Sequence, residues 1–263
     1  KCRVMTPDQI EETIQAFAQG ARRAAETGAD AVQIHGAHGY LISEFLSPFF
    51  NQRQDEWGGS DERRFGLVKA VIQETRKAVP EDLPILIKLN TNDFTPKQGV
   101  TPPLAGTYAG WLRDMGIDAV ELSCGTFFTL HMVRGQIPAK EIVKVLPFWM
   151  RPFARLQFRR LRRSCGFSEA YNLPAAEHIK PALGPVPLML VGGVRRLSQM
   201  EKLVAEGYTD LISMSRPFIR EPYLVKRFKE GKAEEAACIS CNKCFAAVAN
   251  NLPVRCYVNG LPI

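Results

Sequence analysis

Two histidines and a tyrosine stand close together near the start of the chain. His35, His38 and Tyr40 follow directly after the apolar run 31–34. Imidazole N–H groups can donate hydrogen bonds to an oxygen, and a phenol can deliver a proton. Gly36 and Gly39 lie between them and let the backbone turn tightly and approach a ligand. The segment therefore predicts a buried strand that opens into a loop able to bind and protonate a small molecule.

A second chemical group is formed by four cysteines near the C-terminus. Cys238, Cys241, Cys244 and Cys256 are separated by two, two and eleven residues. Three thiolates on one tight loop and a fourth further along suit a tetrahedral metal site, which an iron–sulfur cluster or a structural zinc could use. The alternative is four buried cysteines without metal. The remaining cysteines, Cys2, Cys124 and Cys165, are isolated, and we assign them no role.

A third group combines cations and glycines at the ends of apolar runs. Lys88 lies one residue before the end of the run ILIKL, and an unpaired lysine is costly to bury, which favours a functional role. Gly192 and Gly193 follow the run 188–191, and Ser215 and Arg216 close the run that begins at 211. Glycine N–H groups can cradle an anion, and an arginine can pair with it.

The segment 31–64 resembles the Old Yellow Enzyme family, the FMN-dependent NADH:flavin oxidoreductases. The resemblance rests on HGAHGYL at 35–41, FLSP at 45–48, the polar residues Asn51, Arg53, Asp55 and Glu56, and a GGS-E-R turn at 58–63. It extends from Thr6 to about Pro217. The cysteine-bearing tail resembles the branch of the family that includes 2,4-dienoyl-CoA reductase and trimethylamine dehydrogenase.

The resemblance implies a role for each chemical group. His35 and His38 would bind the carbonyl oxygen of an α,β-unsaturated substrate, and Tyr40 would protonate its α carbon. FMN, reduced by NAD(P)H, would supply hydride to the β carbon. Lys88 stands where many members have arginine beside the flavin. The FMN phosphate would be bound by Gly192, Gly193, Ser215 and Arg216, although most members have glycine in place of Ser215.

The same branch implies a [4Fe–4S] cluster on the four cysteines, which would relay single electrons to the flavin. The middle spacing of two residues departs from the three of dienoyl-CoA reductase and is nearer to that of trimethylamine dehydrogenase. Zinc therefore remains the alternative metal.

The elements that position these residues repeat one pattern. A glycine and an aspartate precede a short apolar run at Gly28, Gly116 and Gly207. Two further strands are expected at 85–89 and 188–191, and a helix begins after Thr6 in a capping box. Amphipathic helices are expected at 65–78, 104–115, 175–183, 198–206 and 222–230. Apolar strands that alternate with such helices predict an α/β fold with a parallel sheet covered by helices.

Polar residues at the ends of five strands favour a (β/α)8 TIM barrel over a doubly wound sheet, because no G-x-G-x-x-G follows any strand. The resemblance makes these strands four to eight. We therefore expect a partial TIM-barrel flavin domain over 1–236 and a Cys-rich metal-binding tail over 237–263. The sequence begins with Lys1 rather than a methionine, so we expect it to be the C-terminal part of a larger enzyme. Whether a further FAD or NAD(P) domain follows Ile263 stays open.

The charge of the chain is concentrated in one segment. The formal net charge is +7, and six arginines with no acid lie between Arg151 and Arg163, so the rest of the chain carries +1 (7 − 6). This distribution does not indicate general nucleic-acid binding. For the segment 146–163 we favour a solvated lid or a subunit-contact helix. The alternative is a basic amphipathic segment for a membrane surface or for a phosphate-bearing substrate such as a CoA ester.

Neither an apolar run of membrane-spanning length nor a signal-peptide core is found, so a cytoplasmic location is expected. The predicted function is an FMN-dependent oxidoreductase that passes hydride from NAD(P)H to an activated alkene. The predicted partner is a small-molecule substrate. No nucleic acid is expected, contact with a membrane is not favoured, and a homo-oligomer stays open. The alternatives are a non-catalytic or partner-dependent fragment, and a flavin barrel like tRNA-dihydrouridine synthase, which would need a basic groove across the barrel mouth.

Overall fold

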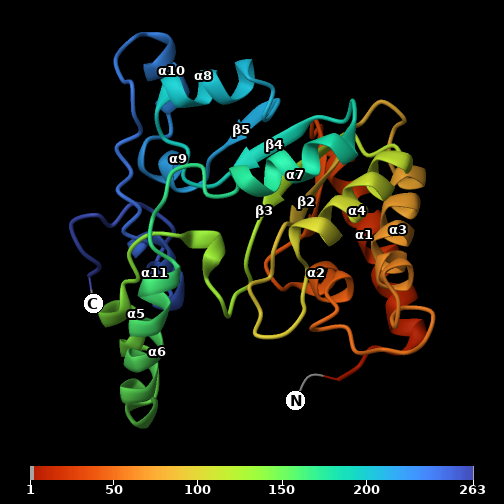
Figure 1. Ribbon diagram of the computed structural model, residues 1–263, viewed down its shortest axis with the longest axis horizontal. Helices are drawn as coiled ribbons and strands as arrows, with labels where there is room; N and C mark the ends of the chain where they lie inside the picture. Colours follow the sequence, from red (N-terminus) through yellow and green to blue (C-terminus); the bar gives the residue numbers. More distant parts are fainter. Residues whose placement is uncertain (1–2, 263) are drawn as a thin grey trace.

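A computed structural model describes residues 3–262, and Cys2 lies outside these described residues. Five parallel strands form one sheet in sequence order (Figure 1). The strands are β1 (Val32–Gly36), β2 (Ile85–Asn90), β3 (Ala119–Ser123), β4 (Leu188–Val191) and β5 (Leu211–Ser213). Because every pair is parallel, all five carboxyl ends lie at one edge of the sheet. The predicted five strands and the parallel sheet are confirmed.

Helices alternate with the strands as predicted. The longer ones are α1 (Pro7–Glu26), α3 (Asp61–Ala78), α4 (Pro102–Asp114), α6 (Arg151–Ser164), α7 (Leu173–Leu183) and α8 (Leu197–Ala205). The shorter ones are α2 (Leu41–Leu46), α5 (Ala139–Lys144), α9 (Arg216–Arg220), α10 (Leu224–Lys229) and α11 (Lys243–Ala249), with 3-10 turns η1 (His131–Val133) and η2 (Phe148–Met150).

Helix caps explain where the helices begin. The predicted capping box of α1 is present: the Thr6 hydroxyl accepts from the Gln9 N–H, and the Gln9 side chain accepts from the Thr6 N–H. The third helix begins four residues earlier than predicted, at Asp61. The reason is that the Ser60 hydroxyl accepts a hydrogen bond from the Arg63 N–H and so caps the helix there.

The core lies between the sheet and the helices on one of its faces. Ile85, Ile87 and Leu89 alternate along β2 and are almost completely buried. Tyr108 of α4 is fully buried, and its hydroxyl donates to the Leu46 carbonyl at 2.8 Å, which ties α4 to the end of α2. The opposite face of the same strands carries polar side chains. Packing of the core on one face therefore holds in place the strands that carry those polar side chains on the other.

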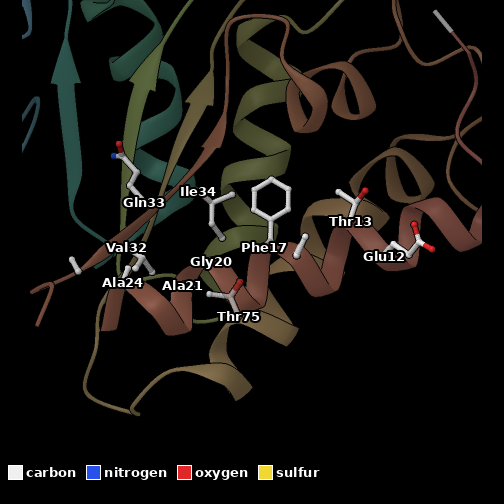
Figure 2. Close-up of a pocket in the computed structure, with 12 residues that line it drawn as sticks. Glu12, Thr13, Phe17, Gly20, Ala21, Ala24, Val32, Gln33, Ile34 and Thr75 are labelled. Atoms are coloured by element: carbon white, nitrogen blue, oxygen red, sulfur yellow. The ribbon is translucent and has the colours of Figure 1, made fainter. Parts of the chain in front are cut away.

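The sheet has two edges that no described strand covers, at β1 and at β5. Along the β1 edge, one face of α1 leaves an open, mainly apolar groove of about 880 Å³. Figure 2 shows Phe17 and Ala21 of α1 facing this groove, together with Val32 and Ile34 of β1. An apolar groove beside an unpaired strand is a surface that another strand and helix could cover.

The segment between β3 and α7 packs against the cysteine-bearing tail. Leu161 of α6 and Phe245 of α11 contact a small cluster formed by Leu130, Ile137 and Cys165. The Asn242 side-chain amide donates to two backbone carbonyls of this segment, at 2.6 and 2.9 Å. The arginine-rich part forms η2 and α6, so of the two forms expected for it, a lid or a helix, it takes the helical one. Among the described helices, none combines the length and apolarity needed to cross a membrane.

Candidate active site

The end of β1 and the loop that follows it bring the two histidines and the tyrosine together. The ring centroids of His35 and His38 lie 5.0 Å apart, and those of His35 and Tyr40 lie 5.4 Å apart. His35 belongs to β1, whereas Tyr40 immediately precedes α2 and is 53% exposed. The three side chains are therefore grouped at the carboxyl edge of the sheet, with the phenol open to solvent.

The buried amide of Asn90, at the end of β2, ties together the loops after three strands. Its oxygen accepts from the His38 N–H at 3.4 Å, and its nitrogen donates to Asp93 at 2.7 Å and to the Gly125 carbonyl at 3.0 Å. His38 has a left-handed backbone with φ +67°, which a non-glycine residue adopts only when its surroundings hold it. Sequence reasoning missed Asn90 and Asp93, although a polar residue that closes an apolar strand marks such a position.

Gly36, the last residue of β1, and Gly39, in the loop after it, serve different purposes. A Cβ on Gly36 would come within 2.9 Å of the Lys88 carbonyl, so this glycine allows β1 and β2 to approach each other closely. Gly39 has φ +75°, and a Cβ there would lie 3.1 Å from Thr126. Gly36 thus serves strand packing, and Gly39 serves the turn.

Both imidazoles are held in their neutral form near pH 7. Burial, together with the nearby His35 and Lys88, lowers the pKa of His38 to about 4. Burial also lowers the pKa of His35, assisted by Lys88 and opposed by Glu121. The His38 Nε2 lies 2.6 Å from the Ser123 hydroxyl. These side chains can therefore polarise an oxygen through N–H donation rather than through a full positive charge.

Lys88 is engaged in an ion pair on the polar face of the sheet. Its Nζ lies 2.5 Å from the Glu121 carboxylate, and the two side chains are 19% and 9% exposed. The same carboxylate oxygen accepts from the Gln33 amide at 2.9 Å. Strand register produces the pair, because Lys88 is aligned with His35 on one side and with Glu121 on the other. Sequence reasoning missed Glu121, although an acid inside the apolar run AVELS could have indicated it.

The four residues predicted to bind phosphate share one small cavity. Gly192, Gly193, Ser215 and Arg216 line it after β4 and β5, together with Tyr171 and Cys238. Arg216 also reaches toward the tail. Its Nη1 donates to the Arg134 carbonyl at 2.9 Å and to the Asn242 side chain at 2.5 Å. The structure thus brings the predicted anion-binding residues together and links them to the cysteine loop.

A neighbouring cavity is lined by all four tail cysteines. Cys238, Cys241, Cys244 and Cys256 surround it with Arg216. Burial raises the pKa of the Cys244 thiol, and the charge of Arg216 opposes this. Within residues 3–262, no three His, Cys, Asp or Glu side chains are arranged to hold a metal ion. The cysteines therefore converge on one space without forming a compact four-sulfur site.

Comparison with known proteins gives the family. The model of the NADH:flavin oxidoreductase / NADH oxidase family matches residues 1–142. An NADPH dehydrogenase of Geobacillus sp. (strain WCH70) is 36% identical over 219 residues, which are 83% of this chain and 54% of that protein. An NADH oxidase of Thermoanaerobacter brockii is 33% identical over 260 residues, which are 98% of this chain and 35% of that protein.

Among solved structures, a 2-naphthoyl-CoA reductase in complex with 2-naphthoyl-CoA superimposes with a TM-score of 0.80. It is 30% identical, and the match covers 98% of this chain and 35% of that one. The chain therefore belongs to the NADH:flavin oxidoreductase / NADH oxidase family, which confirms the resemblance carried by the 31–64 motifs. It spans between about a third and about half of the length of these relatives.

Proposed function

We propose that this chain belongs to a flavin-dependent oxidoreductase centre that reduces an activated alkene. It would supply the residues that bind the substrate and those that bind the FMN phosphate. The observation that carries the proposal is the grouping of His35, His38 and Tyr40 at the carboxyl edge of a parallel sheet. Bound FMN would take hydride from NAD(P)H and pass it to the β carbon of the alkene. This reaction class is supported by the names of three similar proteins: an NADPH dehydrogenase, an NADH oxidase and a 2-naphthoyl-CoA reductase.

The histidines would bind the carbonyl oxygen of the substrate. Because the pKa of each imidazole is lowered, each can offer one N–H without a formal charge. If the Ser123 hydroxyl donates to Nε2 of His38, the proton of the ring resides on Nδ1. Ser123 would then act as a positioning residue that fixes which nitrogen of His38 donates to the substrate.

Tyr40 would deliver the proton to the α carbon. Its ring lies beside His35, and its 53% exposure leaves the hydroxyl accessible to a ligand that enters over the carboxyl edge. A phenol keeps its proton near neutral pH and can give it up in the transition state as a general acid. Hydrogen bonds from both histidines would hold the substrate carbonyl while that proton moves.

The residues present fit the FMN phosphate. The shared cavity is lined by two glycines, whose N–H groups suit an anion, and by the cationic Arg216. Lys88 would lie near the flavin ring, where it keeps its ion pair with Glu121. Glu121 would therefore moderate the positive charge that Lys88 presents to the cofactor.

We further propose that the five strands are strands four to eight of a (β/α)8 barrel. Their parallel order and the uncovered edges at β1 and β5 support this. The apolar groove between α1 and β1 is where a further strand–helix unit would pack, whether from the same polypeptide or from another. The groove also favours the second candidate function, a unit that depends on a partner and has no activity alone.

The tail, residues 237–263, is proposed as a metal-binding unit that holds a [4Fe–4S] cluster, with zinc as the alternative. Support comes from the single cavity that the four cysteines line. Zinc would need all four sulfurs about 2.3 Å from one ion. A cluster bonds its thiolates to different irons and needs them further apart. The reason to prefer the cluster over zinc is the resemblance of the tail to the 2,4-dienoyl-CoA reductase and trimethylamine dehydrogenase branch.

The test is reconstitution of the anaerobically purified chain with FMN, followed by titration with a phenol that mimics the enolate. The proposal expects flavin absorption bands that the phenol perturbs. Changing His38 to Ala should weaken phenol binding about 10²-fold or more, as for one lost oxyanion donor. His178→Ala, an exposed histidine on α7, is the matched control. Failure to take up FMN would favour the partner-dependent unit instead. Iron, sulfide and zinc analysis of the same sample separates the metals.

A further inference from the structure

The helix α6 presents large apolar side chains to solvent. On η2 and α6, Phe148, Trp149, Phe153 and Leu156 are 79%, 68%, 67% and 50% exposed. In Figure 1, α6 is the green helix that projects away from the sheet beside α5 and α11. Trp149, Phe153 and Leu156 follow one another at spacings of four and three residues. They therefore form a stripe that begins at Trp149 on η2 and continues along α6.

This stripe lies on the side of α6 that faces away from the protein. Phe158 and Leu161 are the residues through which α6 packs on the cluster of Leu130, Ile137 and Cys165. At 3.6 residues per turn, the midpoint of Phe158 and Leu161 lies about 140° around the axis from the midpoint of Phe153 and Leu156. The packed side and the apolar stripe are thus on opposite sides of the helix, and folding of the described chain leaves the stripe uncovered.

Uncompensated positive charge accompanies the stripe. Two of the six arginines hold the helix in place by donating to backbone carbonyls: Arg151 to Leu146 and Lys144, and Arg162 to Ile137. The other four have no hydrogen bond or ion pair to any described residue, and no acid lies between residues 146 and 164. These four are Arg155, Arg159, Arg160 and Arg163.

We propose that α6 docks on the surface of an anionic lipid bilayer. Its apolar stripe would enter the boundary between head groups and acyl chains, and its free arginines would contact lipid phosphates. A helix with Trp, Phe and Leu on one side and arginines beside them has the composition of an interfacial helix. Each arginine near an anionic surface adds to the attraction. The body of the protein, packed on the opposite side of α6, would then face the aqueous phase.

The charge of α6 favours lipid over other occupants. A second copy of this helix would bring its arginines against the same arginines, with no acid in the segment to compensate them. A nucleic acid would satisfy the arginines but would leave Leu156 without a stacking partner. This proposal differs from the expectation, drawn from the sequence, that membrane contact is not favoured. The difference arises because the sequence pattern does not reveal which side of α6 packs against the protein.

The experiment is flotation of the full chain with phosphatidylcholine vesicles that contain or lack phosphatidylglycerol. Binding is expected only with the anionic lipid and should weaken as salt is raised. Phe153→Ser should weaken binding about tenfold, because it removes one inserted side chain. Arg159→Gln should weaken it about fivefold. The matched controls are Phe128→Ser, which changes a phenylalanine 73% exposed elsewhere, and Arg23→Gln on α1. Both should bind like the unchanged chain.

Trp149 gives an independent readout, because Trp57 and Trp111 are only partly exposed. Anionic vesicles should shift its fluorescence to the blue, and Trp149→Phe should lose the shift while it keeps vesicle binding. Vesicle binding that the α6 variants leave unchanged would overturn the proposal. The absence of binding to anionic vesicles would also overturn it, and a Phe153-dependent dimer in sedimentation velocity would then identify a second copy as the occupant. Arginine-dependent binding to an oligonucleotide without binding to vesicles would also overturn it.

Discussion

The ion pair between Lys88 and Glu121 offers a direct test of how the polar face of the sheet is built. The two side chains meet at 2.5 Å, and each is mostly buried. Removal of either partner leaves the other charge in a poorly hydrated place, which for buried pairs costs about 3–5 kcal/mol. Removal of both leaves no unpaired charge and should cost far less.

The exposed fractions of the two side chains determine which single substitution lowers the free energy of unfolding more. Glu121 is 9% exposed and Lys88 is 19% exposed. Lys88→Met therefore leaves the more buried charge, the Glu121 carboxylate, without a partner and should lower the free energy of unfolding by about 3 kcal/mol. Glu121→Gln should cost about 2 kcal/mol, because the longer lysine can reach water and a glutamine can still accept from Gln33. The double variant should lose only about 1 kcal/mol, so the coupling between the two changes is large.

Urea unfolding of the unchanged chain, the two single variants and the double variant, analysed by linear extrapolation, measures these differences in the free energy of unfolding. The control is Arg22→Gln, which breaks an α1 pair whose side chains are 61% and 64% exposed and should change stability by less than about 0.5 kcal/mol. A double variant as unstable as the sum of the two single variants would refute the reasoning. So would a Lys88→Met protein as stable as the unchanged chain.

Three further changes test the loop after β1. The pKa of His38 is about 4 in the folded chain and 6.5 ordinarily, so the unfolded state takes up the proton first as pH falls. This pKa difference should lower stability by about 2 kcal/mol between pH 7 and pH 5, and the decline measured for His38→Asn should be smaller by about that amount, with the lowered pKa of His35 still contributing. Tyr40→Phe should slow alkene reduction by about 10²- to 10⁴-fold in stopped-flow and leave flavin reduction by nicotinamide unchanged; equal slowing would indicate a structural role. Asn90→Ala should cost about 2–3 kcal/mol in urea unfolding, because it leaves buried partners unsatisfied. A loss below about 0.5 kcal/mol would contradict that bridging role.

Local chemistry was sufficient to predict the five strands and most of the longer helices that alternate with them, but not the short helices α2, α5, α9 and α11. Apolar runs such as 85–89 become strands because their side chains need burial on the helix-covered face, and Thr6 starts α1 through contacts three residues away. The short spacing within the 35–40 segment was enough to predict that its histidines and tyrosine would meet. The family motifs in the same stretch are equally local, and the comparisons confirm the family that they indicated.

Tertiary structure alone decided the partners of these groups. Glu121 meets Lys88 because β2 and β3 pair in one particular register, and no local pattern encodes that register. Asn90 joins three loops that are far apart in sequence. The exposed stripe of α6 is likewise a tertiary property, because it depends on which side of an amphipathic helix finds a neighbour. Residue types and short spacings thus determine the elements and their chemistry, whereas long-range packing determines which charges, donors and apolar faces remain free to act.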